Sequence, residues 1–253
     1  MTEAREHFSR ALELFTQAAE YWQGKVGELP TDQEEACKKI ISAGLGFIEL
    51  GTAESDGAHC RAGIARALPA DDAKKKEAVQ AAVVDYQRLW KAYPKMALGQ
   101  YSGLSAAKML EYTGKFAAAI ETNQAVYKAL EEGLQAKQSY VEDLHGRVTD
   151  QLMSCWNEVK VGEHAKAIEA GEAWLASETS TDGAEVTWEP QIRKRLAMAY
   201  YRRWAAAGVE KRDDKDRQRA LEEATWVADR YPGEVAARFV LRGIAAAERK
   251  MKE

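Results

Sequence analysis

The chain has 253 residues, of which 46% are hydrophobic and 30% are charged, so it can bury a sizeable core and is not expected to be disordered. Its 36 basic and 40 acidic residues give a net charge of -4, and this near balance favours neither nucleic acid nor a membrane surface as a partner. The three cysteines, Cys37, Cys60 and Cys155, are odd in number and far apart, which is a poor disulfide framework and suits either a reducing compartment or merely buried thiols.

Apolar residues recur three and four positions apart along almost the whole chain, which is the spacing of amphipathic helices. The expected helices cover residues 3–23, 33–67, 72–93, 96–112, 115–132, 138–160, 163–176, 188–207, 217–231 and 234–251. Glycines weaken the pattern between 51 and 68, so the segment 33–67 is either one helix or two helices broken near Gly51. Loops are expected at 177–185 and at 210–216. No segment alternates apolar and polar residues, and we predict an all-α protein of ten or eleven helices without a sheet.

The beginning of the chain is polar, and no run of eighteen apolar residues occurs anywhere. The sequence therefore predicts no signal peptide and no membrane insertion. A cytoplasmic location is favoured, and the periplasm stays open for a chain whose signal has been removed. Because the helical pattern already runs at residue 3 and still runs at Met251, the chain could also be a segment of a larger protein.

Turn residues recur at a common interval. Gly114, Gly162 and Gly208 are spaced by 48 and 46 residues. Pro94 and Pro232, both preceded by tyrosine, are 138 residues apart, which is three times 46. These landmarks predict helix pairs that repeat about every 46 residues and bury their apolar faces against their neighbours.

The glycine turns resemble those of the tetratricopeptide repeat family. That family has a glycine at the turn, an aromatic residue two positions later and an alanine three positions beyond it. Gly114, Phe116 and Ala119 match this register. Gly162 and Ala167 match it as well, with His164 in place of the aromatic residue.

The second helices of the pairs also resemble those of the family, although the chain departs from the family pattern in two respects. Ala82 and Ala220 each lie twelve residues before Pro94 and Pro232, the separation that the family shows. The period of about 46 exceeds the family's usual value of about 34, and Lys194 stands where an early tryptophan is expected. The tyrosine–proline endings also look like the repeats of bacterial envelope-assembly lipoproteins and coordinators.

The resemblance implies a right-handed superhelical solenoid of antiparallel helix pairs in one domain, 1–253. Within it, 70–251 would hold the repeats and 1–69 divergent N-terminal helices. The first helix of each pair lines the concave groove in the family. Counting back from the turn glycines, this implies a partner-binding set of Tyr101, Lys108, Trp156, Lys160, Arg195 and Arg202.

The stretch 193–219 adds a charge argument, because it holds ten basic and four acidic residues. Arg195 and Arg202 are seven positions apart and share one helix face. A groove of arginines and aromatic residues suits an acidic peptide or a C-terminal carboxylate. The alternative is a solvated basic face offset by Glu210, Asp213, Asp214 and Asp216.

The sequence contains no signature of catalysis or of cofactor binding. None of the four histidines, His7, His59, His145 and His164, has a second ligand at metal spacing on a predicted face. Trp90, Trp174 and Trp204 lie on apolar stripes and are expected in the core. We predict no catalytic residue, no metal and no cofactor.

Three functional hypotheses follow. The first is a non-catalytic protein-interaction scaffold that binds another protein or a peptide in its concave groove, where an acidic partner would suit the basic residues. The second is an assembly subunit that self-associates or helps to build a cell-envelope complex. The third is a small-ligand sensor, or an enzyme with an unrecognised site in the groove. Nucleic acid is not expected as a partner because the chain is acidic overall.

Overall fold

The computed structural model describes residues 2–27, 35, 39, 45–69, 72–135, 139–178, 187–207 and 213–252. In these residues there are ten α-helices and no strand, which confirms the all-α prediction. The chain divides into two compact units, unit 1 (Met1–Gln135) and unit 2 (Ala136–Glu253). Whether they form one superhelical domain stays a prediction. Within the described residues, no helix is both long and apolar enough to cross a membrane.

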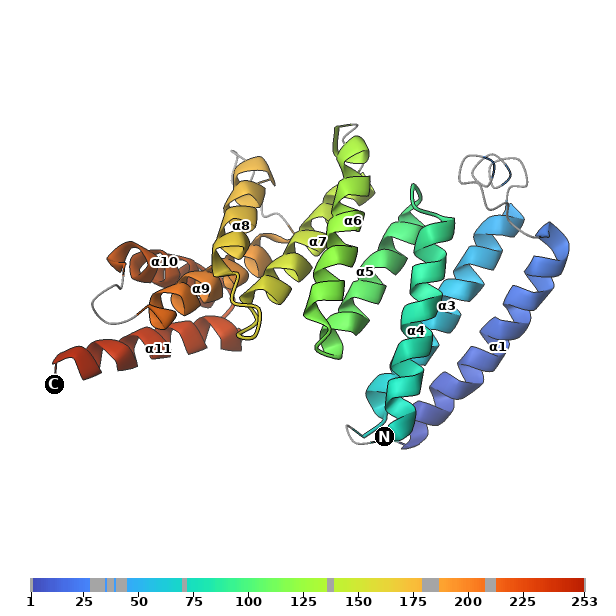
Figure 1. The fold of residues 1–253 in the computed structure, drawn as a ribbon, viewed down its shortest axis with the longest axis horizontal. Helices are drawn as coiled ribbons and strands as arrows, with labels where there is room; N and C mark the ends of the chain where they lie inside the picture. The colour runs from blue at the N-terminus through green and yellow to red at the C-terminus, as the bar shows by residue number, and fades with distance from the viewer. Residues whose placement is uncertain are drawn as a thin grey trace. The chain divides into compact units, whose positions relative to one another are not determined.

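Unit 1 is a stack of neighbouring helices (Figure 1). Its helices are α1 (Thr2–Val26), α3 (Leu45–Ala67), α4 (Ala73–Ala92), α5 (Ala97–Tyr112) and α6 (Phe116–Gln135). Each helix packs against the next, and α3 also touches α5. Leu50, Leu89 and Tyr93 form a buried cluster between α3 and the end of α4, and Ala19 and Trp22 of α1 pack against this cluster.

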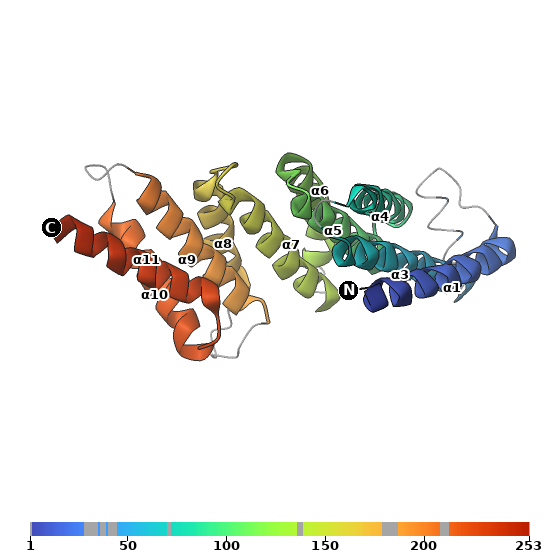
Figure 2. The same ribbon diagram turned by 90° about the horizontal axis from the view of Figure 1, so that it is seen from below.

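Unit 2 repeats this arrangement (Figure 2). Its helices are α7 (Ser139–Asn157), α8 (His164–Glu178), α9 (Glu189–Ala206), α10 (Asp214–Arg230) and α11 (Val235–Lys252). Consecutive helices pack together, and α9 also contacts both α7 and α11. Trp204, Ile192 and Leu196 of α9 are among its largest fully buried side chains. Contacts between alternate helices are typical of a helical repeat.

The glycines of the two predicted turns, Gly114 and Gly162, have left-handed backbone. Gly114 has φ 74° and Gly162 has φ 67°, values that glycine adopts at little cost. At the end of α5 the N–H of Gly114 donates to Glu111 (2.9 Å) and that of Lys115 to Leu110 (2.9 Å), the hydrogen bonds of a Schellman cap. The second turn is longer, because α7 ends at Asn157, five residues before its glycine.

The alanines of these turns are packing positions. Ala119 and Ala167 have no exposed surface, so each allows a neighbouring helix to approach closely. The third predicted turn glycine, Gly208, lies outside the described residues.

The two tyrosine–proline endings share one local geometry. Tyr93 ends α4 with φ -128° and donates its N–H to Leu89, and Tyr231 ends α10 with φ -127° and donates to Val227. A proline disfavours helical backbone in the residue before it and cannot continue the helical hydrogen bonding. Both helices therefore stop at the predicted place.

Several predicted helix boundaries differ from the structure. Helix α1 ends at Val26 and α6 at Gln135, each three residues beyond the predicted end. Helix α3 runs unbroken through Gly51, so the alternative of a break there is excluded. Helix α10 begins at Asp214, because the side chain of Asp213 caps it by accepting from the N–H of Lys215 (2.8 Å). The charged connector predicted at 210–216 is thus partly helical. Helix α7 ends at Asn157 and not at residue 160.

Other predictions fall on residues that the structure does not describe. Cys37 and residues 179–185 of the predicted loop lie outside the described residues. Cys60 and Cys155 are both buried thiols, as expected for cysteines that fill the core.

Candidate functional site

Helices α7 and α9 are joined by three side-chain hydrogen bonds of constant sequence offset. The donors are Trp188, Arg195 and Arg202, and the acceptors are Asp143, Asp150 and the backbone carbonyl of Asn157. Each bond joins residues 45 positions apart, and both the donors and the acceptors are spaced by seven, two helical turns. The two helices therefore run in the same direction with a fixed register, close to the period of 46 read from the turn residues.

The predicted arginines belong to this register. The guanidinium of Arg195 donates to both carboxylate oxygens of Asp150, at 2.7 and 3.4 Å. Arg202 donates to the carbonyl of Asn157, the last residue of α7, whose carbonyl has no partner within the helix. The side-chain amide of Asn157 donates to the carbonyl of Arg195 at 3.1 Å. Both arginines thus hold α9 against α7.

The structure gathers only part of the predicted site. Arg195 and Arg202 both contact α7, and Trp156, in the last turn of α7, is buried. Lys160 lies in the turn after α7 and is exposed. Tyr101 and Lys108 lie on α5 in unit 1, where Tyr101 is half-buried and Lys108 pairs with Glu111 at 2.7 Å.

The basic side chains of 193–219 pair with carboxylates, most of which lie outside that stretch. Arg193, Lys194, Arg203, Arg217 and Arg219 make ion pairs with Glu189, Glu234, Asp216, Glu248 and Glu223, among others. The hydrogen bond that Arg203 donates to the carboxylate of Asp216 raises the pKa of Arg203 above its ordinary value, and the negative charge of Asp216 acts in the same direction. These side chains would have to exchange an existing partner to bind a new one. Lys211 and Arg212 lie outside the described residues.

A larger opening lies in unit 1, and we call it the α3–α4–α5 groove. It is lined by Arg61 of α3, by one side of α4 between residues 75 and 85, and by Tyr112, Thr113 and Lys115 where α5 ends. Its volume is about 1130 Å³, above the range of most small-molecule sites. A segment of polypeptide would fit there.

The groove offers apolar surface to a ligand. Val84 of α4 and Tyr112 of α5 both line it, and each is about half exposed. Tyr112 is held in place by Lys75, whose Nζ lies 5.2 Å from the ring centroid. The same ammonium group donates to the carbonyl of Leu68 at 3.1 Å. The aromatic ring is therefore positioned before any ligand arrives.

The groove is also basic. Four basic side chains and two acidic ones line it, and Arg61 is already paired with Asp85. The first turn of α4 contains Lys74, Lys75 and Lys76 and no acidic residue. Lysines at a helix N-terminus oppose the helix dipole, at about 0.3–1 kcal/mol each. The positive end of α4 and its lysines together attract anionic groups to this place.

Sequence reasoning missed this groove. It followed the first helices of the predicted pairs, whereas the groove lies mainly on α4, a second helix in that assignment. Two signals were present in the sequence. One is the run Lys74–Lys76 directly after the cap residue Asp72, and the other is Val84, which lies off the buried stripe of Val79, Val83 and Tyr86.

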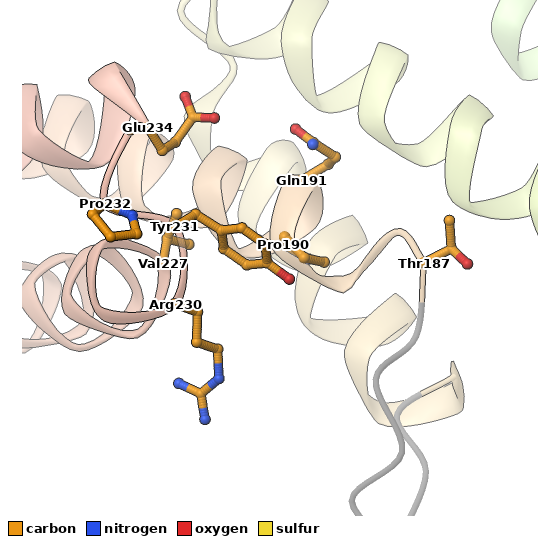
Figure 3. Close-up of a pocket in the computed structure, with 9 residues that line it drawn as sticks. Thr187, Pro190, Gln191, Val227, Arg230, Tyr231, Pro232 and Glu234 are labelled. Atoms are coloured by element: carbon orange, nitrogen blue, oxygen red, sulfur yellow. The ribbon is translucent and has the colours of Figure 1, made fainter.

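A second cavity, of about 740 Å³, lies in unit 2 between the start of α9 and the turn from α10 to α11 (Figure 3). Figure 3 shows the ring of Tyr231 directed toward Pro190. The two charged residues that line this cavity, Arg230 and Glu234, have opposite signs. Arg230 also stacks on Trp226, 4.2 Å from the ring centroid. The cavity has no charge preference that would select a ligand.

In the part of the chain that the structure describes, no three His, Cys, Asp or Glu side chains are placed to hold a metal ion. Comparison of the chain with models of protein families, with curated protein sequences and with solved structures finds no match. The function of the protein is therefore inferred from the geometry of the chain itself.

Proposed function

We propose that this protein is a non-catalytic helical-repeat scaffold, similar in design to tetratricopeptide repeats, that binds an acidic segment of another protein in the α3–α4–α5 groove. The observation that carries the proposal is the combination of Lys75 and Lys76, the two lysines in the first turn of α4 that line the groove, with the half-exposed Val84 and Tyr112. Such a surface is unfavourable unless an anionic and partly apolar ligand covers it.

The chemistry of the groove favours a peptide with alternating acidic and apolar residues. Lys76 is exposed and makes no ion pair with a described residue, so it is free to bind a carboxylate. An apolar side chain that covers Tyr112 or Val84 would contribute about 1–2 kcal/mol, since each is already half-buried. The lysines would raise the association rate and supply selectivity against basic segments.

The repeat architecture supports the scaffold role. Stacked helix pairs with a constant register present an extended surface, and proteins of this type bind polypeptides along it. The fixed offset of 45 residues between α7 and α9 is one sign of such a register.

The test is fluorescence anisotropy with labelled twelve-residue peptides in which glutamate alternates with leucine or phenylalanine. A second set carries lysine in place of glutamate. We expect the acidic set to bind, the basic set not to bind, and the affinity to fall as salt is added.

Substitutions inside and outside the groove test whether the peptide binds there. Lys76→Glu and Tyr112→Ala each remove surface contacts and leave the core intact, so we expect each to weaken acidic-peptide binding by about tenfold, or 1.4 kcal/mol. Lys128→Glu is the matched control, because it makes the same charge change at an exposed position of α6 outside the groove. Equal loss in the Lys76 and Lys128 variants, or equal binding of the two peptide sets, would disprove the proposal.

A further inference from the structure

The outward face of α11 exposes large apolar side chains. Ala237, Val240 and Ile244 are buried, whereas Val235 is 76% exposed and Phe239 is 54% exposed. Phe239 packs edge-on against Tyr201 of α9, with ring centroids 5.9 Å apart. Its position is therefore defined although half of its surface meets solvent.

The same face of α11 is basic. Arg238, Arg242 and Arg249 are all exposed, and they are spaced by four and seven positions on one side of the helix. Within the described residues, neither Arg238 nor Arg242 makes an ion pair. The acidic residue of the helix, Glu248, binds Arg217 of α10 instead. The exposed face thus combines two apolar side chains with three positive charges.

The outward face of α1 has the opposite charge. Leu14 is 60% exposed and Tyr21 is 59% exposed, and they are seven positions apart. Glu6, Glu13 and Glu20 are exposed beside them, also at intervals of seven. No described basic residue pairs with these three carboxylates. Arg10 and Lys25 are exposed positive charges on this side of the helix, and the Nζ of Lys25 lies 5.5 Å from the ring centroid of Tyr21. The three carboxylates outnumber these two positive charges, which leaves the face acidic.

We infer that α11 of one copy of this chain docks on α1 of a second copy. The exposed apolar residues are four positions apart on α11 and seven positions apart on α1, and both spacings keep them on one side of the helix, as a helix-on-helix contact requires. The flanking carboxylates of α1 meet the flanking guanidinium groups of α11 in such a contact. An α1–α1 or α11–α11 contact would bring like charges together, so the charge pattern excludes the symmetric alternatives.

This interface is heterologous, and it therefore leaves one α1 face and one α11 face unused at the ends of each assembly. Association then proceeds beyond a dimer unless the geometry closes a ring. The inference does not rest on the α3–α4–α5 groove, which involves neither face.

Sedimentation equilibrium of the full chain across a concentration series, at low salt, tests the inference. We expect the mean mass of the wild type to rise with concentration. Glu13→Arg with Glu20→Arg makes both faces basic, and Arg238→Glu with Arg242→Glu makes both faces acidic. Each double variant alone should associate at least about tenfold more weakly. A mixture of the two should associate again, because each basic face then meets an acidic one.

Glu121→Arg with Glu131→Arg changes the same charges on exposed positions of α6 and should leave the association unchanged. Circular dichroism verifies that every variant is folded. A wild type that stays monomeric, charge variants that associate as the wild type does, or a mixture that does not associate would each overturn the inference. So would a monomer whose α11 binds phosphatidylserine vesicles and loses this binding in Arg238→Glu with Arg242→Glu, since the basic face would then serve a membrane surface.

Discussion

Glu223 of α10 is the most deeply buried carboxylate among the described residues, with 2% of its surface exposed. It accepts a hydrogen bond from Arg193 of α9 at 2.8 Å and lies 3.4 Å from the guanidinium of Arg219. Glu222, its neighbour in sequence, also pairs with Arg219, at 3.0 Å, but its side chain is 47% exposed. Changes at these two positions therefore allow a buried ion pair to be compared with an exposed one on the same helix.

Glu223→Ala should lower the free energy of unfolding by about 2–3 kcal/mol. Loss of one partner of a fully buried pair costs about 3–5 kcal/mol. The cost is smaller here because Arg193 keeps its bond to Glu189 and because Arg219 is 42% exposed and can be hydrated. Glu222→Ala should cost about 0.5 kcal/mol, the value of an exposed pair. Both changes have the same effect on helix propensity, so the difference reports burial.

Urea unfolding followed by circular dichroism gives both values. We expect the midpoint for Glu223→Ala to fall well below that for Glu222→Ala, with little change in the slope. If Glu222→Ala destabilises the protein as much as Glu223→Ala does, the buried network does not hold α9 to α10 and the reasoning is refuted.

Two further predictions concern the turns between helices. Gly114→Ala should lower the free energy of unfolding by about 1–2 kcal/mol, because φ 74° is strained for an L side chain; equal urea midpoints for variant and wild type would contradict this. Burial, followed by the charges of Arg202 and Arg203, lowers the pKa of His164 below its ordinary value of 6.5. The unfolded chain therefore binds the proton first, and stability is lost as the pH falls below about 6.5. Urea unfolding at about pH 7.5 and 5.5 should show a smaller loss for His164→Gln than for the wild type, and equal losses would contradict this reasoning.

The helices and the residues that end them could be predicted, because both depend on local sequence. Gly114 and Gly162 adopt left-handed backbone at the turns. The prolines that follow Tyr93 and Tyr231 end α4 and α10 regardless of the tertiary contacts around them. The start of α10 was missed because Asp213 caps the helix from within a run of charged residues that resembles a connector.

The environment of Arg195 and Arg202 could not be predicted from local sequence. Their hydrogen-bond acceptors, Asp150 and the carbonyl of Asn157, lie 45 positions earlier in the chain, on α7. A count of charges between 193 and 219 does not include these acceptors. The heptad spacing placed both arginines on one face correctly, but only the packing of α9 on α7 determines what that face contacts. The groove beside Tyr112 likewise requires three helices to be placed together.

The turn at Gly114 is specified by chirality rather than by size. No atom lies within 4 Å of the position that a Cβ would occupy there, so a side chain has room. What excludes ordinary residues is the sign of φ, since 74° is nearly the mirror image of the helical value of about -63°. D-alanine, the mirror image of the natural residue, would fit this turn without strain, and by restricting the unfolded chain it would stabilise the protein by about 0.4–1 kcal/mol. Between α5 and α6 the chain thus reverses its handedness for one residue.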